Sequence, residues 1–430
     1  MRRLRTSVRV AEKVGEGLGR SALLQRTLPP RAAGPVKDLP MDPFPSDRES
    51  ALQRLEEFVH SAAAAYARTR NFVQAGHGNV SRLSAALRHR LLSEEEAIAA
   101  VLAAHRFSAV EKFVQEVVWR TYWKGWLEQH PGVWEDYVQQ ASSPVSDGVA
   151  DMLGATEATG AMSRFTRELR ATGYMHNHAR MWWAAWWCHQ HGLPWAAGAR
   201  FFFDHLLDAD AASNTLGWRW VAGLQTPGKT YLARRDNLAK YWQGHGSLEG
   251  IDDHVRARIP DETADRSRAS LPDYPEAPSA LEGKVALLGH ADDLSIETTP
   301  LGAVRPRAVA LLDQPGEADS VVKRTWRSRA MDDASARWTA HYGKDVSRLA
   351  RWDALPGWLG ETGCDELVLM APFVGPDADA WRPVRRTLQD TGIRVVECRR
   401  AWDQRLFPAA RAGFFPFWHK ASPMVRLRQP

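Results

Sequence analysis

The hydrophobic pattern of this 430-residue chain changes once, and that change limits the folds available to it. From residue 44 to residue 242 the apolar residues recur at helical spacing, with Ala, Leu, Glu and Arg between them. After residue 283 they form short runs, VALLGH, AVALLD, LVLMAPF and RVVEC, which alternate with helical stretches. Short apolar runs of this kind are typical of a parallel sheet with crossover helices. We therefore predict an all-helical part followed by a smaller parallel α/β part.

The segment between the two patterns is polar, rich in proline and without clear periodicity, so we interpret it as a linker. The first 40 residues form a basic extension that we expect to be poorly ordered. The predicted organisation is an extension at 1–40, a helical domain at 41–245, a linker at 246–283, an α/β domain at 284–420 and a tail at 421–430.

The positive charge of the chain is confined to that extension. It holds nine Lys and Arg against three Asp and Glu, whereas residues 41–250 hold 21 against 22 and residues 251–430 hold 26 against 26. The extension could be a basic arm, a targeting segment or an over-extended translation start ahead of Met41. Net charge therefore gives no argument for a nucleic-acid partner, which would need a local basic groove.

Neither a membrane span nor a metal site is indicated. The chain has no run of about 18 apolar residues, and its N-terminus lacks the apolar stretch of a secretory signal. The three cysteines, Cys188, Cys364 and Cys398, are far apart and form no CxxC pair. We expect a cytoplasmic protein without metal or membrane contact; a monomer is expected, although the sequence leaves the oligomeric state open.

Tryptophan is concentrated in residues 172–195, TGYMHNHARMWWAAWWCHQHGLPW, which hold five of the nineteen tryptophans. On a helix, Trp182 and Trp186 form one ridge, and Trp183 and Trp187 form the neighbouring ridge. Such a helix is apolar over much of its circumference and is expected at the centre of a domain. The simplest interpretation is that these four rings fill a core.

Polar residues near this stretch point to a ligand. Asn177, Arg180 and Met181 stand at i, i+3 and i+4, so they share one helix face. Further along, Asp208 and Asp210 lie between an apolar run and a pair of tryptophans. Buried carboxylates are costly unless a polar group satisfies them, and a bound ligand is the economical explanation.

Several segments of the helical part, taken in order, resemble the photolyase/cryptochrome flavoproteins. They are YARTRNF, NVSRLSAAL, FVQEVVWRTYW, TGYMHNHARM, LPW, LLDADAASNTLGWRWVAG and RRDN. The likeness runs almost continuously from residue 44 to about residue 242. It implies FAD, held in a bent shape inside the helical domain, as the cofactor.

The resemblance also implies the residues that hold the flavin. The VSRLS loop would bind the diphosphate through Ser81, Leu83 and Ser84, with Tyr66 as a further ligand, while Val80 replaces the usual threonine. Clustered donors at a helix start suit an anionic diphosphate. Without the family context, a serine there would equally cap an ordinary helix.

Around the flavin ring, the resemblance implies a salt bridge of Arg180 with Asp208 beside the reactive edge. Asp210 would reach the ring, and Asn214 would face N5. An amide can donate to or accept from N5, so Asn214 would influence which redox state persists.

Trp218 and Trp195 match the inner two members of the family's tryptophan electron-transfer chain. The sequence around the outer member is divergent, and Trp134, Trp186 and Trp187 stay open as candidates.

The implied substrate face has six residues. An equivalent of Glu116 in the repair members hydrogen-bonds the thymine carbonyls of a flipped-out dimer, and two tryptophans pack against its rings. Taken alone, the same helix could simply carry a salt bridge and a core tryptophan. His178 stands where the repair enzymes have an arginine, which weakens a phosphate contact there. The six residues are Arg70, Glu116, Trp119, Asn177, Met181 and Trp220.

These features favour a light-driven deoxyribodipyrimidine photolyase that acts on UV-damaged DNA. Excited, fully reduced FAD would donate an electron to a cyclobutane pyrimidine dimer and recover it after splitting. A cryptochrome-like blue-light photoreceptor is the alternative, and a flavin protein without photochemistry is a third possibility.

The C-terminal half carries a second resemblance, to the family's Rossmann-like antenna domain. VALLGHADDLSIETTPL resembles its opening, and the segment that ends in FFPFWHK resembles its closing half. Because this domain normally comes first, we predict a circular permutation, which costs little when termini lie at a domain junction. An antenna chromophore stays unknown, since no ligands for one can be assigned.

Overall fold

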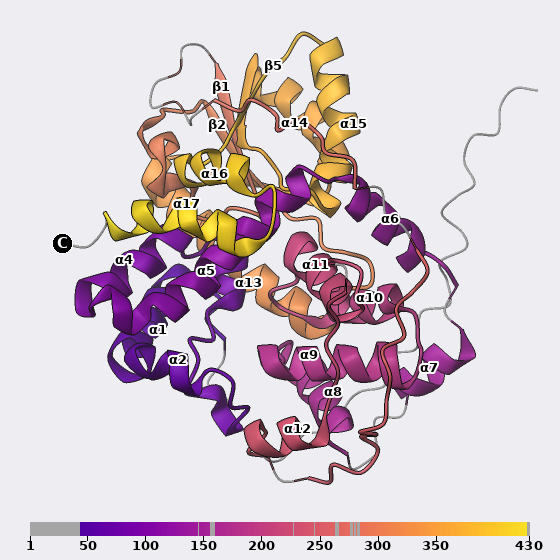
Figure 1. Cartoon of the computed structure of the whole chain (residues 1–430). Coiled ribbons are helices and arrows are strands. Elements are labelled where there is room, and N and C mark those ends of the chain that lie inside the picture. Colours follow the sequence, from indigo (N-terminus) through magenta and orange to yellow (C-terminus); the bar gives the residue numbers. More distant parts are fainter. Residues whose placement is uncertain are drawn as a thin grey trace, which may run out of the picture. The chain divides into compact units, whose positions relative to one another are not determined.

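The structure is a computed structural model. It describes residues 44–144, 146–154, 160–226, 228–244, 246–262, 266–275, 278, 281 and 284–427. The predicted basic extension at 1–40 therefore lies outside the described residues. Figure 1 shows helices first along the chain and a sheet with its helices afterwards. The predicted fold class, a helical part followed by a smaller parallel α/β part, is confirmed.

Helices occupy most of the described residues between 48 and 241, as the helical spacing of apolar residues predicts. Some of their starts carry capping side chains. Asp47 accepts a hydrogen bond from the backbone N–H of Ser50 at 2.7 Å, and Ser93 and Glu96 form a reciprocal capping box. The helices are α1 (Arg48–Ser61), α2 (Tyr66–Thr69), α3 (Ser84–Arg88), α4 (Glu94–Ala104), α5 (Phe107–Glu128), α6 (Gly132–Ala141), α7 (Asp147–Gly154), α8 (Ala161–Thr172), α9 (Asn177–Ala185), α10 (Trp195–His205), α11 (Ala211–Val221) and α12 (Arg235–Tyr241).

The sheet has five parallel strands in the order β3-β2-β1-β4-β5. The chain first extends the sheet from β1 through β2 to β3 and then returns to the other side of β1 with β4. This reversal creates a switch point between β1 and β4 at their carboxyl ends. The elements are β1 (Val285–His290), β2 (Ala308–Leu312), α13 (Val321–Tyr342), β3 (Val346–Leu349), α14 (Leu355–Thr362), β4 (Glu366–Met370), α15 (Pro376–Asp390), β5 (Arg394–Cys398), α16 (Ala401–Leu406) and α17 (Phe414–Arg426).

The two faces of the sheet belong to different hydrophobic cores. Leu287 on β1 joins the large core that also contains the helices of the first part, together with α13. Its neighbour Leu288 points to the opposite face and joins a smaller core with Trp352 and Trp381. This division follows from the period of two along a strand. One face of the sheet thus continues the core of the helical part.

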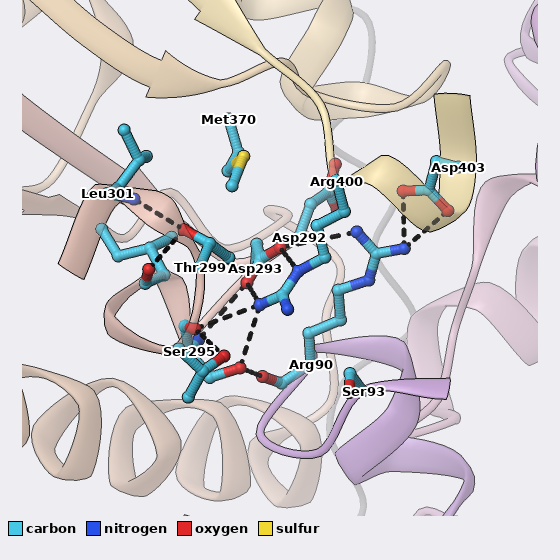
Figure 2. Close-up of polar contacts among 12 residues, drawn as sticks. Arg90, Ser93, Asp292, Asp293, Ser295, Thr299, Leu301, Met370, Arg400 and Asp403 are labelled. Atoms are coloured by element: carbon cyan, nitrogen blue, oxygen red, sulfur yellow. Dashed lines mark hydrogen bonds and ion pairs between the residues drawn. The ribbon is translucent and has the colours of Figure 1, made fainter. Parts of the chain in front are cut away.

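A buried network of charges joins the two parts (Figure 2). Arg90 donates to both carboxylate oxygens of Asp403 at 2.9 and 2.7 Å, and Arg400 donates to both oxygens of Asp293 at 2.6 and 2.7 Å. The hydroxyl of Ser295 donates to the Arg90 carbonyl at 2.6 Å. Burial opposes the charge on Asp293, but Arg400 and Arg90 outweigh it and hold its pKa below the usual range. We name Arg90, Asp293, Ser295, Arg400 and Asp403 the junction cluster.

The C-terminal helix α17 returns to the helical part. The rings of Trp119 on α5 and Phe414 are stacked at 3.8 Å with an interplanar angle of 8°, and the Tyr122 hydroxyl donates to the Ala412 carbonyl at 2.6 Å. The predicted boundary at residue 420 falls inside this helix. Because α17 follows the sheet in sequence but packs against α5, residue 420 does not mark an end of packing. The predicted domain limits stay predictions.

The described linker residues lie against the helical part. The backbone N–H of Ala269 donates to the Gln129 carbonyl at 2.9 Å, and Arg266 donates to the Gln225 carbonyl at 2.9 Å. Among the described residues, no helix combines the length and the apolar character needed to cross a membrane.

Candidate functional site

The centre of the site is an ion pair between α9 and the loop that precedes α11. Arg180 Nη1 and Nη2 lie 3.1 and 3.0 Å from the two oxygens of Asp208, and Arg180 Nε donates to the Met175 carbonyl at 2.7 Å. Asp208 is buried, and the Ser84 side chain also hydrogen-bonds to it. Burial opposes ionisation of Asp208, but Arg180 and Arg120 lower its pKa below the usual range. The pair is thus a fixed, charged unit.

Asp210 lies two residues further and is the N-cap of α11. It accepts a hydrogen bond from the backbone N–H of Ser213 at 2.9 Å, and it lies 3.8 Å from Arg88 and 4.0 Å from Arg120. Burial opposes its charge, but Lys124, Arg88 and Arg120 keep its pKa low. The structure therefore brings both predicted carboxylates into a buried region dominated by cations.

Two of these cations lie near a carboxylate but do not hydrogen-bond to it: Arg120 Nη2 is 4.0 Å from Asp210, and Lys124 Nζ is 3.6 Å from Glu94. Nε and Nη2 of Arg120 and Nζ of Lys124 are buried without a hydrogen-bond partner among the residues that the structure describes. Buried unsatisfied donors are rare in native proteins and call for a water, an ion or a ligand. An anionic group such as a diphosphate suits cationic donors of this kind. We name Arg120, Lys124, Asp208 and Asp210 the ligand cluster.

The sequence placed Arg120 with Glu116 and Trp119 on one helix face but gave it no part in binding the flavin, and it gave Lys124 no part in the site. Both lie on the α5 face that carries Glu116, at four and eight residues from it. That spacing was the available signal.

The predicted diphosphate loop is only partly in place. Ser84 contacts the site through Asp208, whereas the Ser81 hydroxyl accepts a hydrogen bond from the Leu83 N–H at 3.4 Å. We expected one helix from Ala85 onward, but α3 has five residues and α4 starts at Glu94. Ser84 does begin a helix, so the donors lie at a helix start as expected, but a helix of five residues has little dipole, and phosphate binding by this loop stays a prediction.

The fourth predicted diphosphate ligand, Tyr66, is half-buried beside Arg70 and Glu116. Burial and the Glu116 charge raise the pKa of its hydroxyl, so Tyr66 is neutral and able to donate. Asn214 on α11 donates through Nδ2 to the Ala199 carbonyl at 2.9 Å, which fixes the amide.

Trp218 is buried against α10. Its ring centroid lies 5.1 Å from that of Phe202 and 5.9 Å from that of Trp183. A Cβ at Gly198 would overlap the Trp218 ring, so glycine permits this close approach. Trp195, three residues before Gly198 on the same helix, is 3% exposed. Trp195 and Gly198, which contacts the Trp218 ring, thus lie on the same turn of α10.

The three candidates for the outer relay differ in exposure. Trp134 and Trp187 are buried, and their indole N–H groups donate to Asp379 and to the Pro194 carbonyl at 2.8 Å each. Trp186 is half-buried and begins a π-helical turn. The Trp183 ring centroid lies 5.9 Å from those of Trp186 and Trp218, which gives a second path from Trp218 toward the surface beside the predicted one through Trp195. This geometry favours Trp186, because an outer donor needs access to solvent.

Part of the predicted substrate face is assembled on α5. Arg70 Nη1 lies 2.9 Å from Glu116 Oε1, and Lys112 lies 3.6 Å from the same oxygen. Phe414 covers one face of the Trp119 ring. The sequence did not predict this partner, which lies almost three hundred residues away.

The rest of the predicted face lies around His178. Its Nδ1 is 2.8 Å from the Asn71 carbonyl and its Nε2 is 3.2 Å from the Tyr231 hydroxyl, and the Trp220 and Tyr231 rings are 5.9 Å apart. Burial lowers the pKa of His178, so it is neutral and engaged within the protein. The two remaining predicted residues, Asn177 and Met181, are exposed and half-buried.

A small pocket lined by Arg88, Lys124, Asp210 and Asp292 lies near the switch point of the sheet. Near it, ligand atoms of His290, Asp292 and Asp377 lie within 4.8 Å of one another. His290 is already engaged through Nε2 with the Met370 carbonyl and through Nδ1 with the Asp292 N–H, while Asp292 pairs with Arg88 at 2.7 Å. These contacts use the atoms that a metal would need. The prediction that the chain holds no metal stays a prediction.

Comparison with known proteins identifies this region. A family model described as the FAD binding domain of DNA photolyase matches residues 160–244, the range that carries Arg180, Asp208, Asp210 and Asn214. This part of the chain belongs to the photolyase/cryptochrome family. FAD is therefore its cofactor, as predicted, and the unsatisfied donors of the ligand cluster fit a bound dinucleotide.

Curated relatives are deoxyribodipyrimidine photo-lyases. The Escherichia coli protein is 31% identical over 203 residues, which cover 44% of this chain and 42% of that protein. The Synechococcus protein is 32% identical over 195 residues, which cover 42% of this chain and 39% of that protein. The chain thus spans about two fifths of these photolyase relatives.

Two solved structures show weaker likeness. A cryptochrome from Synechocystis has 22% identity and a TM-score of 0.40, with 49% of this chain and 47% of that chain covered. A class III photolyase from Agrobacterium tumefaciens has 27% identity and a TM-score of 0.35, with 43% and 40% covered. At these TM-scores neither likeness carries an argument about this photolyase-type chain.

Proposed function

We propose that this photolyase-type protein is a light-driven DNA repair enzyme that splits cyclobutane pyrimidine dimers in UV-damaged DNA. The observation that carries the proposal is the arrangement along α5. Glu116 and Trp119 lie at its half-buried stretch, and the unsatisfied Arg120 and Lys124 follow at its buried stretch. With a rise of about 1.5 Å per residue, Arg120 and Lys124 lie about 6 and 12 Å along the helix axis from Glu116, so a flavin held by these cations would be a near neighbour of the Glu116 face.

When bound, FAD supplies the electron that excitation makes available to the dimer. The residues of the chain then position the partners of that transfer. Glu116 hydrogen-bonds the base edge, and it exchanges its contact with Arg70 for this bond. Trp119 and Trp220 offer aromatic faces to a flipped-out dinucleotide, and Phe414 holds Trp119 rigidly from behind. Stacking of about 1–3 kcal/mol per base offsets the few kcal/mol needed to extrude a damaged base.

Photoreduction of oxidised flavin would use the buried tryptophans. We propose Trp218 as the inner relay and Trp195 as the second. Trp218→Phe keeps most of the volume of the side chain but is far harder to oxidise. This variant should therefore retain FAD and lose photoreduction.

A cryptochrome-like photoreceptor is the second candidate function. His178 favours it, because its two ring nitrogens contact Asn71 and Tyr231 and leave no cation for a DNA phosphate. A route for photoreduction through Trp183 to the half-buried Trp186 serves either function.

The deciding experiment is light-dependent loss of dimers from an irradiated oligonucleotide by the purified, chemically reduced holoprotein. We expect turnover in light and none in darkness. Glu116→Gln should slow dimer loss with FAD content unchanged, whereas Glu111→Gln, one helical turn away, should leave it unchanged. Complete photoreduction together with no dimer loss would establish the photoreceptor function instead.

We further propose that the order of the two parts is a circular permutation of the family arrangement. The return of α17 from the sheet to α5 supports it, because this helix completes the helical core from the end of the chain. A rearranged chain with residues 284–427 placed before residues 44–244 should fold and retain FAD. A rearranged chain that is soluble but binds no FAD would contradict the permutation.

A further inference from the structure

A carboxylate of the linker accepts a hydrogen bond from the indole N–H of Trp195. Trp195 Nε1 donates to Glu262 Oε1 at 2.5 Å, and Gln140 Nε2 donates to Glu262 Oε2 at 2.6 Å. Glu262 is half-buried and Trp195 is buried, so the hydrogen bond lies at the edge of the helical core. The contact gives this tryptophan an anionic hydrogen-bond acceptor. The buried Trp187 indole, in contrast, donates to a neutral backbone carbonyl.

A cation lies over the same ring. The Arg219 guanidinium carbon is 5.6 Å from the Trp195 ring centroid, and Arg219 is 2% exposed. Burial lowers the pKa of Arg219, while Glu262 acts in the opposite direction. Arg266 and Asp136 are the other charged groups that act on Arg219. Trp195 thus has a positive charge on its face and a negative charge at its N–H.

These two charges have opposite effects on an oxidised ring. Removal of an electron from Trp195 creates a cation, which Arg219 repels in a region of low dielectric. A one-electron-oxidised indole is a far stronger acid than indole itself, and its acidic proton is the one that Nε1 shares with Glu262. Transfer of that proton removes the positive charge from the ring and the negative charge from the carboxylate.

We propose that Glu262 takes up the Nε1 proton of Trp195 when this ring is oxidised. The N–H bond of Trp195 breaks, an O–H bond forms on Glu262, and the products are a neutral indole radical and a neutral carboxylic acid. The oxidant is the photoexcited oxidised flavin, acting through Trp218. The inference rests on the proposed role of Trp195 as a relay. Its consequence is a long-lived separated charge, because the electron returns only when the proton also returns.

The contact between Glu262 and Trp195 depends on the order of the two parts in the chain. Glu262 belongs to the segment that joins the helical part to the sheet, and that segment exists because the sheet follows the helices. The linker therefore does more than connect: it supplies a proton acceptor to the relay.

The test compares full-length holoproteins with Glu262→Gln, Glu262→Asp and Glu249→Gln, the last an exposed glutamate of the same linker. In the dark, the indole N–H resonance of Trp195, assigned with Trp195→Phe, should lie far downfield in the parent and Glu249→Gln. It should move upfield in Glu262→Gln, since an amide oxygen accepts a weaker hydrogen bond than a carboxylate.

After a flash, the tryptophan radical should decay about tenfold faster in Glu262→Gln than in the parent. The slowing that deuterated solvent causes in the parent should also disappear in this variant. Glu262→Asp should restore part of both effects. A parental lifetime and isotope effect in Glu262→Gln, with a long-lived radical still lost in Trp195→Phe, would overturn this inference alone. An unchanged radical in Trp195→Phe would show instead that the proposed relay is wrong.

Discussion

The two buried charge clusters of this protein are built differently. In the junction cluster, both guanidinium groups face a carboxylate through two short hydrogen bonds. In the ligand cluster, Arg120 and Lys124 keep buried donor atoms without a hydrogen-bond partner among the described residues. Burying charge is costly in both cases, and the ligand cluster offsets less of that cost with hydrogen bonds, because its two cations lie only at 4.0 Å from Asp210 and 3.6 Å from Glu94. A complete network therefore indicates a structural joint, and an incomplete one indicates a site prepared for a ligand.

The largest expected effect comes from breaking the junction cluster. Asp403→Ala removes the two shortest hydrogen bonds of Arg90, which keeps Glu94 at 3.3 Å and Asp293 at 3.4 Å, and should destabilise the protein by about 3 kcal/mol, the low end for a broken buried ion pair. Chemical denaturation measures the change. Asp353→Asn, which removes an exposed ion pair with Arg351, is the matched control and should have no measurable effect. Equal stability of the two variants would remove the distinction between the clusters.

The ligand cluster should respond in the opposite way. Lys124→Met removes a buried cation that makes no hydrogen bond and lies 3.6 Å from Glu94, which keeps its contact with Arg90, so the apoprotein should keep most of its stability. Affinity for FAD should fall by about 1.5–3 kcal/mol, the usual contribution of a hydrogen bond to a charged group. Flavin release followed by fluorescence measures this affinity. A variant that is less stable as apoprotein but binds FAD normally would assign Lys124 a structural role.

Acid should distinguish the two kinds of buried group. The pKa of Asp293 is lowered, so its contribution to stability is complete above an unfolded pKa of about 3.9 and is lost only below it. Burial, with His77 and His178, lowers the pKa of His176 to about 3. Its contribution is complete above the unfolded pKa of about 6.5 and is lost as the pH falls below that value, by up to about 1.4 kcal/mol per pH unit.

Denaturation at several pH values should therefore show a slope between pH 6.5 and 5 that His176→Asn reduces. The asparagine can still accept the helix-capping hydrogen bond of His176 Nδ1 from the His178 N–H. An unchanged slope would show that His176 is not the group that titrates.

The smallest expected effect concerns the outer relay. Trp186→Phe should slow photoreduction several-fold, because it removes the half-buried electron donor next to Trp183. The melting temperature of this variant should stay unchanged. Trp134→Phe is the comparison, since Trp134 is buried and bound to Asp379. If only Trp134→Phe slows photoreduction, Trp134 and not Trp186 is the outer electron donor.

Much of the fold was predictable from the sequence, because its signals are local. Helical spacing identified the first part, and short apolar runs identified the strands that contain Leu287 and Val368. The same pattern failed between Ala85 and Glu94, where the chain breaks into two helices. Arg90 has a positive φ of 50° there, and its side chain reaches the sheet part, a requirement that no local pattern expresses.

The candidate site was predictable only in part. Arg180 and Asp208 were expected to pair from the family resemblance, and they do. Lys124 was missed because a lysine on a helix face usually points to solvent, and only packing shows that it is 2% exposed.

The sequence by itself determined which segments are helices, which are strands, and which residue types are available for a flavin. Only the tertiary structure decided that Phe414 lies behind Trp119, that Trp195 donates to Glu262, and that Arg90 is hydrogen-bonded to Asp403 while Lys124 Nζ has no hydrogen-bond partner among the described residues. The physical reason is the range of the interactions. Periodicity and capping act within a few residues, whereas these contacts join residues 67 to 313 positions apart in the chain. Their formation depends on how the helices and the sheet pack together.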